Sequence, residues 1–291
     1  MEWVQQLVNG ISIGSIYALI ALGYTMVYGI IKLINFAHGD VFMVGAFIGF
    51  YAIAKWEMNF FAALLLAMML CAVFGVIIER VAYKRLRNST RIAALITAIG
   101  VSLLIEYTVV FFRGAQLESY PKTIENKAIT IFGAQIGTHS ILILSVSIGL
   151  MILLQFIVQK TKIGKAMRAV SHDADAAKLM GINVDNTISA TFAIGSALAG
   201  AAGVIFGLYY TKIDPFMGVI PGLKAFIAAV LGGIGIIPGA MVGGMLLGVV
   251  ETIVSALGFS LWRDAAAFVI LILILVFKPE GIFGKNAREK V

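Results

Sequence analysis

The sequence has few charged residues and a single cysteine. Of its 291 residues, 13% are charged and 60% are hydrophobic, whereas a soluble domain is about 25% charged and roughly half apolar. This composition excludes an ordinary soluble domain and predicts an all-α polytopic membrane protein. Because Cys71 is the only cysteine, an intrachain disulfide and a thiolate metal cluster are both excluded.

Sequence motifs for nucleotide binding and catalysis are also missing. No G-x-x-x-x-G-K-[ST] occurs, since the Gly-Lys pairs at 164–165 and 284–285 lack the upstream glycine and the following hydroxyl. No His-Glu metal spacing and no serine nucleophile elbow is present. The three histidines are far apart in the expected topology. We therefore expect no metal site, no bound cofactor and no enzymatic activity in this chain.

Long apolar stretches dominate the rest of the chain. A membrane-spanning helix needs about 20 residues. The N-terminal stretch lacks a basic flank and exceeds a signal-peptide core, so we expect it to remain as the first helix. The pattern predicts eight or nine transmembrane segments, including broken or re-entrant helices. The apolar stretches are 6–31, 41–54, 60–78, 92–112, 139–159, 188–211, 219–237, 240–257 and 264–277.

Basic residues gather in three clusters that predict the orientation of these segments. The positive-inside rule places all three clusters, and with them the C-terminus, in the cytoplasm. Two spans lie between the first two clusters and four between the last two, so the short stretch 219–237 must cross. The side of the N-terminus stays open, because 41–54 can cross or re-enter. The clusters are Arg80, Lys84, Arg85, Arg87 and Arg91; Lys160, Lys162, Lys165, Arg168 and Lys178; and Lys278, Lys285, Arg288 and Lys290.

The stretch INFAHGD, residues 34–40, interrupts the first two apolar runs with polar residues. Non-helical backbone at membrane depth is tolerated only beside protein or water. The glycine-rich stretch 231–244 is a second break, and paired breaks indicate a transport pathway. We expect Asp40 to cap a helix that begins at Val41. The pathway candidates, which can alternatively support a bent backbone or pair across helices, are Tyr24, Tyr28, Asn35, His38 and Asp40.

Three ionisable residues fall inside the apolar stretches. Glu106 and Glu251 are expensive in a membrane, and we expect interhelical hydrogen bonds to satisfy them. Lys224 is expected to extend its amine to the membrane surface. Small residues that repeat every four positions predict one closely packed helix face. They are Gly195, Ala199, Gly203 and Gly207.

The second basic cluster contains a short polar helix, SHDADAAKLMGIN, at residues 171–183. Ser171 can cap its start and Gly181 can take the left-handed position at its end. Ala177 and Leu179 contribute to a partly apolar surface that fits a groove on a partner. A solvated loop helix is the alternative interpretation.

Three sequence blocks resemble one protein family. They are LVNGISIGSIYALIALGYTMVYGIIKLINFAHGD, GKAMRAVSHDADAAKLMGIN and GLKAFIAAVLGGIGIIPGAMVGG. In this order and nearly from end to end, the chain is similar to the permease subunits of branched-chain amino-acid ABC importers of the LivH type. The loop at 113–138 matches no motif of that family.

The resemblance implies a single permease domain over residues 1–291 and a multi-pass location in the cytoplasmic (inner) membrane, among lipids and without nucleic acid. It implies a second homologous permease, two cytoplasmic ATP-binding subunits that hydrolyse ATP, and an extracytoplasmic substrate-binding protein. Branched-chain or related amino acids are the expected substrates. An ion-coupled secondary transporter or channel is the alternative. The resemblance also implies a coupling segment at 160–187, with the residues Gly164, Arg168, Ser171, His172, Asp173, Ala177, Leu179 and Gly181.

Overall fold

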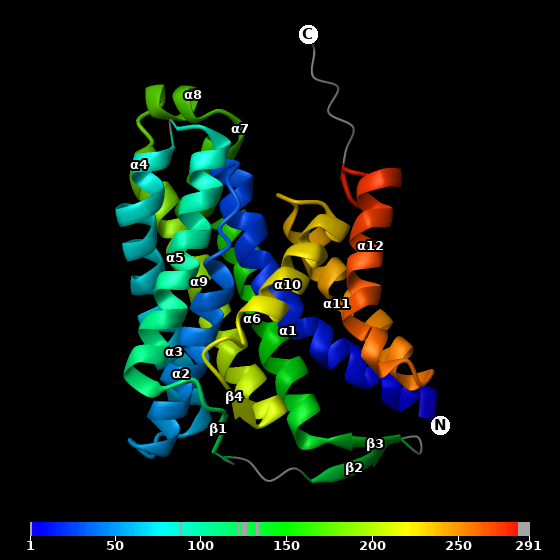
Figure 1. The fold of residues 1–291 in the computed structure, drawn as a ribbon. Helices are drawn as coiled ribbons and strands as arrows, with labels where there is room; N and C mark the ends of the chain where they lie inside the picture. Colours follow the sequence, from blue (N-terminus) through cyan, green and yellow to red (C-terminus); the bar gives the residue numbers. More distant parts are fainter. Residues whose placement is uncertain (1, 88, 122, 124–126, 132–133, 285–291) are drawn as a thin grey trace.

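A computed structural model describes residues 2–284 except 88, 122, 124–126, 132 and 133. Helices form nearly all of the described chain (Figure 1). The elements are α1 Glu2–Ile31, α2 His38–Ala54, α3 Phe60–Ile78, the π-helical turn η1 Glu79–Tyr83, α4 Lys84–Leu86, α5 Arg91–Arg113, β1 Glu118–Ser119, β2 Ala128–Ile131, β3 Ala134–Gly137, α6 Thr138–Lys160, α7 Lys162–His172, α8 Ala174–Leu179, α9 Val184–Tyr210, β4 Lys212–Ile213, α10 Val219–Gly232, α11 Ile237–Ala256, the 3-10 turn η2 Ser260–Trp262 and α12 Arg263–Phe277.

Seven helices in the described part of the chain are long and apolar enough to cross a membrane. Two further apolar helices, α2 and α10, are shorter, with 17 and 14 residues. At 1.5 Å per residue they extend about 26 Å and about 21 Å, less than the roughly 30 Å of a bilayer core. Seven long and two short apolar helices agree with the predicted eight or nine transmembrane segments. The two short helices, α2 and α10, correspond to the predicted broken segments.

The molecule has two distinct ends (Figure 1). One end, here called the α8 end, carries α4, α7, α8 and the C-terminal end of α12. The opposite end, the β end, carries the two small sheets, β1–β4 and β2–β3, and the start of α1. The described members of the three basic clusters therefore lie at the α8 end, as the parity of the spans predicts. Of the C-terminal cluster, Lys285, Arg288 and Lys290 lie outside the described residues.

The two short helices cross with the help of extended chain (Figure 1). Residues 32–37 run back from the α8 end before α2 continues toward the β end. Residues 211–218 run in from the β end before α10 continues toward the α8 end. Three crossings therefore precede the first basic cluster, so the start of α1 lies at the β end. The stretch 219–237 also crosses, as predicted.

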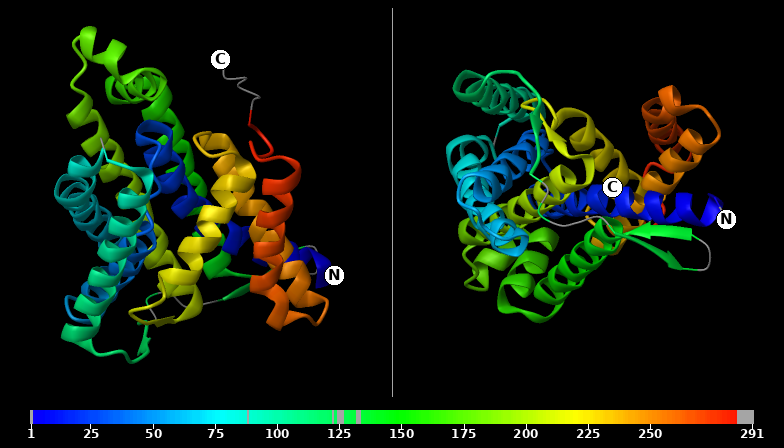
Figure 2. Two further views of the ribbon diagram at one scale, coloured as in Figure 1. Left: turned by 45° about the horizontal axis from the view of Figure 1, so that its top comes forward. Right: turned by 90° about the horizontal axis from the view of Figure 1, so that it is seen from below.

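The first helix, α1, is the centre of the fold. It contacts α6, α9, α10 and α11 and passes through the middle of the helices when the molecule is seen from the β end (Figure 2). Small residues allow this close packing: a Cβ added at Gly14 would lie 2.7 Å from the Cα of Met245 on α11. Without these glycines the helix axes would have to move apart.

The small residues predicted to pack closely on α9 lie against neighbouring parts of the chain. Gly195 faces Gly23 of α1, and Gly203 lies against the backbone of Phe42 and Ala46 on α2. The remaining two members, Ala199 and Gly207, are also buried. By contrast, large side chains on α5 and α12 are exposed, including Phe111 at 83% and Phe277 at 80%. These helices present apolar surface of the kind that lipid or another membrane subunit covers.

Candidate functional site

The two half-helices meet at their N-termini in the interior of the protein. A Cβ added at Gly39, in the first turn of α2, would lie 2.5 Å from the carbonyl oxygen of Gly218, which precedes α10. It would also lie 3.3 Å from the Cα of Gly222. The positive ends of two helix dipoles are thus brought together, and only glycine permits this approach.

A cavity of about 240 Å³ opens beside this junction. Its walls come from α1, the break at 32–37, α2, α5 and the start of α10. Most of the side chains are apolar, and the polar ones converge on one wall. The cavity is lined by Tyr24, Phe36, Asp40, Ile99, Ser102, Leu103, Glu106, Gly218, Val219, Gly222 and Leu223.

Asp40 contributes a carboxyl group to this cavity and does not cap a helix. The prediction that it caps a helix at Val41 is wrong, because α2 already begins at His38, after an Ala37 N-cap without a side-chain hydrogen bond. Asp40 is only 2% exposed, and its carboxyl group faces Ser102 and Glu106 of α5. Its Oδ2 atom has no hydrogen-bond partner among the described residues.

The other pathway candidates divide into two groups. His38 is buried and packs edge-on against Tyr24, with ring centroids 4.9 Å apart, so these two residues join Asp40 near the junction. Asn35 instead accepts a 2.9 Å hydrogen bond from the Tyr83 hydroxyl of η1, which secures the break in the backbone. Tyr28 lies one turn beyond Tyr24, with the amine of Lys32 5.9 Å from its ring centroid, and is absent from the cavity wall.

A second buried carboxylate is balanced by cations. Glu251 of α11 is 0% exposed, and its Oε1 lies 2.8 Å from the Lys224 amine of α10. Lys224 is also 2.6 Å from Asp264 of α12, and Tyr17 of α1 donates a 3.0 Å hydrogen bond to Glu251. Arg263 approaches the same carboxylate at 3.8 Å. The prediction that Lys224 reaches the membrane surface is wrong, since this side chain is 1% exposed and links α10 to α11 and α12.

The predicted coupling segment forms two helices instead of one. The chain turns at Asp173, whose carboxylate accepts 2.9 Å hydrogen bonds from the amides of Asp175 and Ala176. Asp173 is therefore the N-cap of α8, and the predicted cap Ser171 lies in the last turn of α7. The Ser171 hydroxyl donates a hydrogen bond to the Arg168 carbonyl within that helix.

The end of α8 matches the prediction, but its docking face differs. Gly181 has φ +82°, and the amide of Ile182 binds the carbonyl of Ala177, which closes the helix in a Schellman motif. Ala177 is only 4% exposed, so its assignment to the docking surface is wrong. Leu179 and Met180 are 89% and 83% exposed, and they form the outward apolar surface.

Two predicted coupling residues join α7 to the transmembrane part. Gly164 packs against the backbone carbonyls at the end of α6, and the Arg168 guanidinium donates to the carbonyl of Val158 there. His172 is exposed at the end of α7. A cavity of about 260 Å³ separates α7 from the end of α1 and from residues 234–237 of the second break. Besides bordering this cavity, α7 contacts α1 directly.

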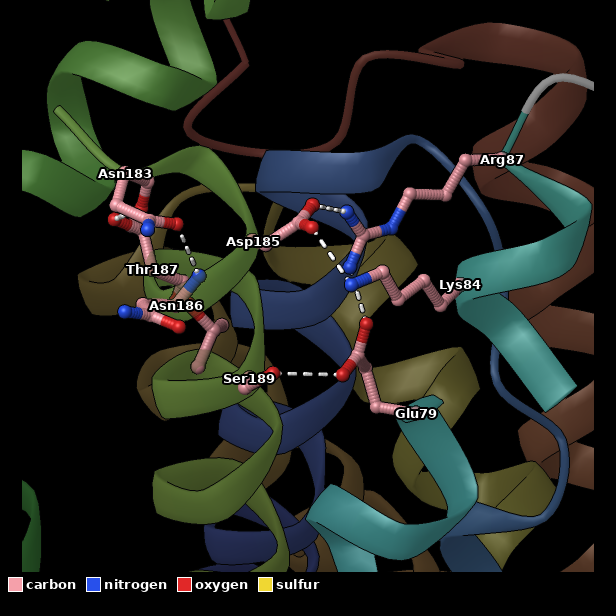
Figure 3. A network of polar contacts seen from close by, with 9 residues as sticks. Glu79, Lys84, Arg87, Asn183, Asp185, Asn186, Thr187 and Ser189 are labelled. Carbon is pink, nitrogen blue, oxygen red and sulfur yellow. Dashed lines mark hydrogen bonds and ion pairs between the residues drawn. The ribbon is translucent and has the colours of Figure 1, made fainter. Parts of the chain in front are cut away.

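A polar network connects η1 and α4 to the start of α9 at the α8 end (Figure 3). Arg87 bridges Glu79 and Asp185, with 2.6 Å to the latter, and Lys84 lies 2.7 Å from Asp185. Glu79 is fully buried and also accepts a 2.7 Å hydrogen bond from Ser189. Two cations of the first basic cluster, Lys84 and Arg87, thus balance two carboxylates and link η1 and α4 to the start of α9.

Sequence reasoning missed the contribution of α5 to the cavity. Ser102 and Glu106 are four residues apart, so both point to one side of the helix. That spacing is a signal for a polar face, but its partner Asp40 is more than 60 positions away. No cluster of three or more His, Cys, Asp or Glu side chains suited to a metal ion occurs in the described ranges.

The similarity to known proteins extends over nearly the whole chain. A family model described as the permease component of branched-chain amino acid transport systems matches residues 6–277. The chain is 43% identical to the high-affinity branched-chain amino acid transport system permease protein LivH of Salmonella typhimurium, with 100% of this chain and 98% of the relative aligned.

Two further relatives carry other names. The chain is 43% identical to the permease protein BraD of Pseudomonas aeruginosa over 100% of this chain and 98% of the relative. It is 27% identical to the ribose import permease protein RbsC of Haemophilus influenzae over 97% of this chain and 87% of the relative. No solved structure matches significantly.

Proposed function

Since the chain belongs to the branched-chain amino acid transport permease family, we propose that it carries leucine, isoleucine, valine or related amino acids inward as the membrane subunit of an ATP-driven importer. The family match over residues 6–277 is the observation that carries this proposal. A homologous permease, two cytoplasmic ATP-binding subunits and an extracytoplasmic binding protein complete the importer. Partner subunits supply ATP hydrolysis, and this chain itself is not an enzyme.

The α8 end faces the cytoplasm in this proposal. All described members of the three basic clusters lie at that end, which is the distribution that the positive-inside rule requires. The binding protein then docks at the β end, and the C-terminus is cytoplasmic. The membrane is the cytoplasmic (inner) membrane.

The ATP-binding subunits act on α7 and α8. Leu179 and Met180 offer a small exposed apolar surface on a capped, closed turn, the form of surface that enters a groove on a partner. Behind it, α7 is attached to α6 through Gly164 and Arg168 and faces the ends of α1 and α10. This arrangement gives ATPase movement a short route to the half-helices.

The transport pathway passes Tyr24, His38 and Asp40, where the two half-helices meet. The alternative, an ion-coupled carrier, would bind coupling ions at Asp40, Glu106 and Glu251, but Lys224 already occupies the carboxylate of Glu251. The coupling surface and the balanced state of Glu251 both favour an ATP-driven importer over an ion-coupled one.

Leu179→Asp tests the proposal in the importer assembled with its partner subunits. We expect leucine uptake into cells to fall by about tenfold or more, equivalent to roughly 1.4 kcal/mol or more of coupling, because a charge would enter an apolar interface. Lys178→Gln on the same helix is the matched control and should retain uptake. Normal uptake by Leu179→Asp would refute the docking surface, and absence of branched-chain amino acid uptake by the parent would refute the substrate.

A further inference from the structure

We propose that the carboxyl groups of Asp40 and Glu106 form a binding site, within the membrane, for the ammonium group of the transported amino acid. The proposal rests on the importer function and specifies where this chain contacts its substrate. The two carboxyl groups lie close to each other in the lining of the cavity at the junction of the half-helices.

The charge of this cavity is not balanced by the protein. No basic side chain is present among its described lining residues. Asp40 is 2% exposed and Glu106 is 5% exposed, and the Oδ2 atom of Asp40 lacks a hydrogen-bond partner in the described structure. Buried carboxylates are normally paired. A ligand with a positive charge and several N–H donors would supply the missing partner.

The remaining walls fit the rest of an aliphatic amino acid. Ile99, Leu103 and Leu223 provide an apolar surface for a branched side chain. The start of α10 at Val219 adds the positive end of a helix dipole, which suits the substrate carboxylate. Tyr24 contributes an aromatic ring that is compatible with an ammonium group.

A metal ion is a poorer match for the same walls. Calcium takes about six to eight oxygen ligands and magnesium about six. The cavity offers the carboxyl groups of Asp40 and Glu106 and the hydroxyls of Ser102 and Tyr24 among mainly apolar residues. An organic ammonium group requires only a few acceptors and tolerates apolar neighbours, so it fits these walls better.

Thiol labelling of the assembled importer tests the site without relying on transport. Cys71→Ala removes the native cysteine and Ser102→Cys places a thiol beside both carboxyl groups. We expect aminoethyl methanethiosulfonate, a cation, to react about tenfold faster than the anionic sulfonatoethyl reagent, since about 1.4 kcal/mol of attraction gives this ratio. Asp40→Asn and Glu106→Gln should each reduce the preference. Glu118→Gln, which removes a carboxylate at the β end, should retain it.

Leucine uptake provides the second measurement. Asp40→Asn and Glu106→Gln should each lower uptake by about tenfold, corresponding to about 1.4 kcal/mol, in complexes that still co-purify with their partners. Equal labelling by both reagents, or labelling by neither, would overturn the ammonium site. A clear cation preference with full uptake in both variants would overturn its role in transport. If the parent takes up no leucine, the substrate assignment fails while the labelling still decides whether the site attracts cations.

Discussion

Each half-helix of this protein is associated with a buried carboxylate, but the two are satisfied differently. On α11, Glu251 is fully buried and has the Lys224 amine of α10 at 2.8 Å and the Tyr17 hydroxyl at 3.0 Å. On α2, Asp40 faces Ser102 and another carboxyl group, Glu106, and no basic side chain is present among the described residues that line its cavity. The first site links helices together, and the second lines a cavity.

The difference is consistent with a structural role for Glu251 and with the proposed transport role of Asp40 and Glu106. Lys224 and Glu251 satisfy each other, so a ligand that bound either one would have to compete with the partner already present. Asp40 and Glu106 have no such competitor and stand at the junction of two half-helices.

Removing the Lys224 amine from its ion pair with Glu251 should cause the largest loss of stability. Lys224→Met would remove the closest cation from the buried Glu251 and leave only Arg263, at 3.8 Å, as its ion-pair partner. This loss is expected to destabilise the protein by about 3 kcal/mol. Thermal unfolding of the purified importer in detergent measures the loss. Lys212→Met, an exposed lysine in β4, is the control. Adding Glu251→Gln to Lys224→Met should restore part of the stability, and an unchanged unfolding temperature in the single variant would contradict the structural role.

Separating the two half-helices should have a smaller but clear effect. Gly39→Ala would place a methyl group 2.5 Å from the Gly218 carbonyl oxygen, and overpacking of this kind costs about 1–3 kcal/mol. Gly100→Ala is the matched control, because a Cβ there meets no atom within 4 Å. The same unfolding measurement applies to both variants. Equal stability of the two would show that α2 and α10 do not depend on this contact.

Neutralising the unbalanced site should barely affect the fold. Asp40→Asn keeps the size of the side chain and removes a charge without a counterion, so we expect the free energy of unfolding to change by about 1 kcal/mol or less. Its effect should appear in uptake instead. Glu251→Gln is the informative comparison, since it leaves Lys224 without its closest buried partner. A loss of stability in Asp40→Asn as large as that in Glu251→Gln would remove the distinction between the two sites.

The sequence predicted the spans and their directions because both depend on local properties. Apolar length identifies a crossing segment, and the placement of basic residues assigns its ends. The same reasoning found that 219–237 crosses even though α10 is short. It did not decide the side of the N-terminus, because the route of residues 32–37 depends on contacts such as that between Asn35 and Tyr83.

The site was harder to predict because its partners are distant in sequence. Local sequence suggests helix capping for Asp40, because its contact with Ser102 and Glu106 of α5 is a tertiary contact that the neighbouring residues do not reveal. Lys224 was assigned to the membrane surface because Glu251 and Asp264 belong to later helices. The cap of α8 was misplaced by two residues, since Ser171 and Asp173 are both good N-cap residues and only the end of α7 selects between them.

The smallest effect is expected from the half-exposed ion pair at the α8 end. The side chains of Lys84 and Asp185 are both 50% exposed, and pairs of this kind contribute about 0.2–1 kcal/mol. Lys84→Met should therefore change the unfolding temperature only slightly. Arg87→Met should cost several times more, because Arg87 also binds Glu79, which is fully buried. Chemical unfolding of both variants in parallel, at low and at high salt, distinguishes the exposed Lys84–Asp185 pair from the buried Arg87–Glu79 pair. Salt should weaken the contribution of Lys84 and leave that of Arg87 largely intact, and equal losses would show that burial does not distinguish these ion pairs.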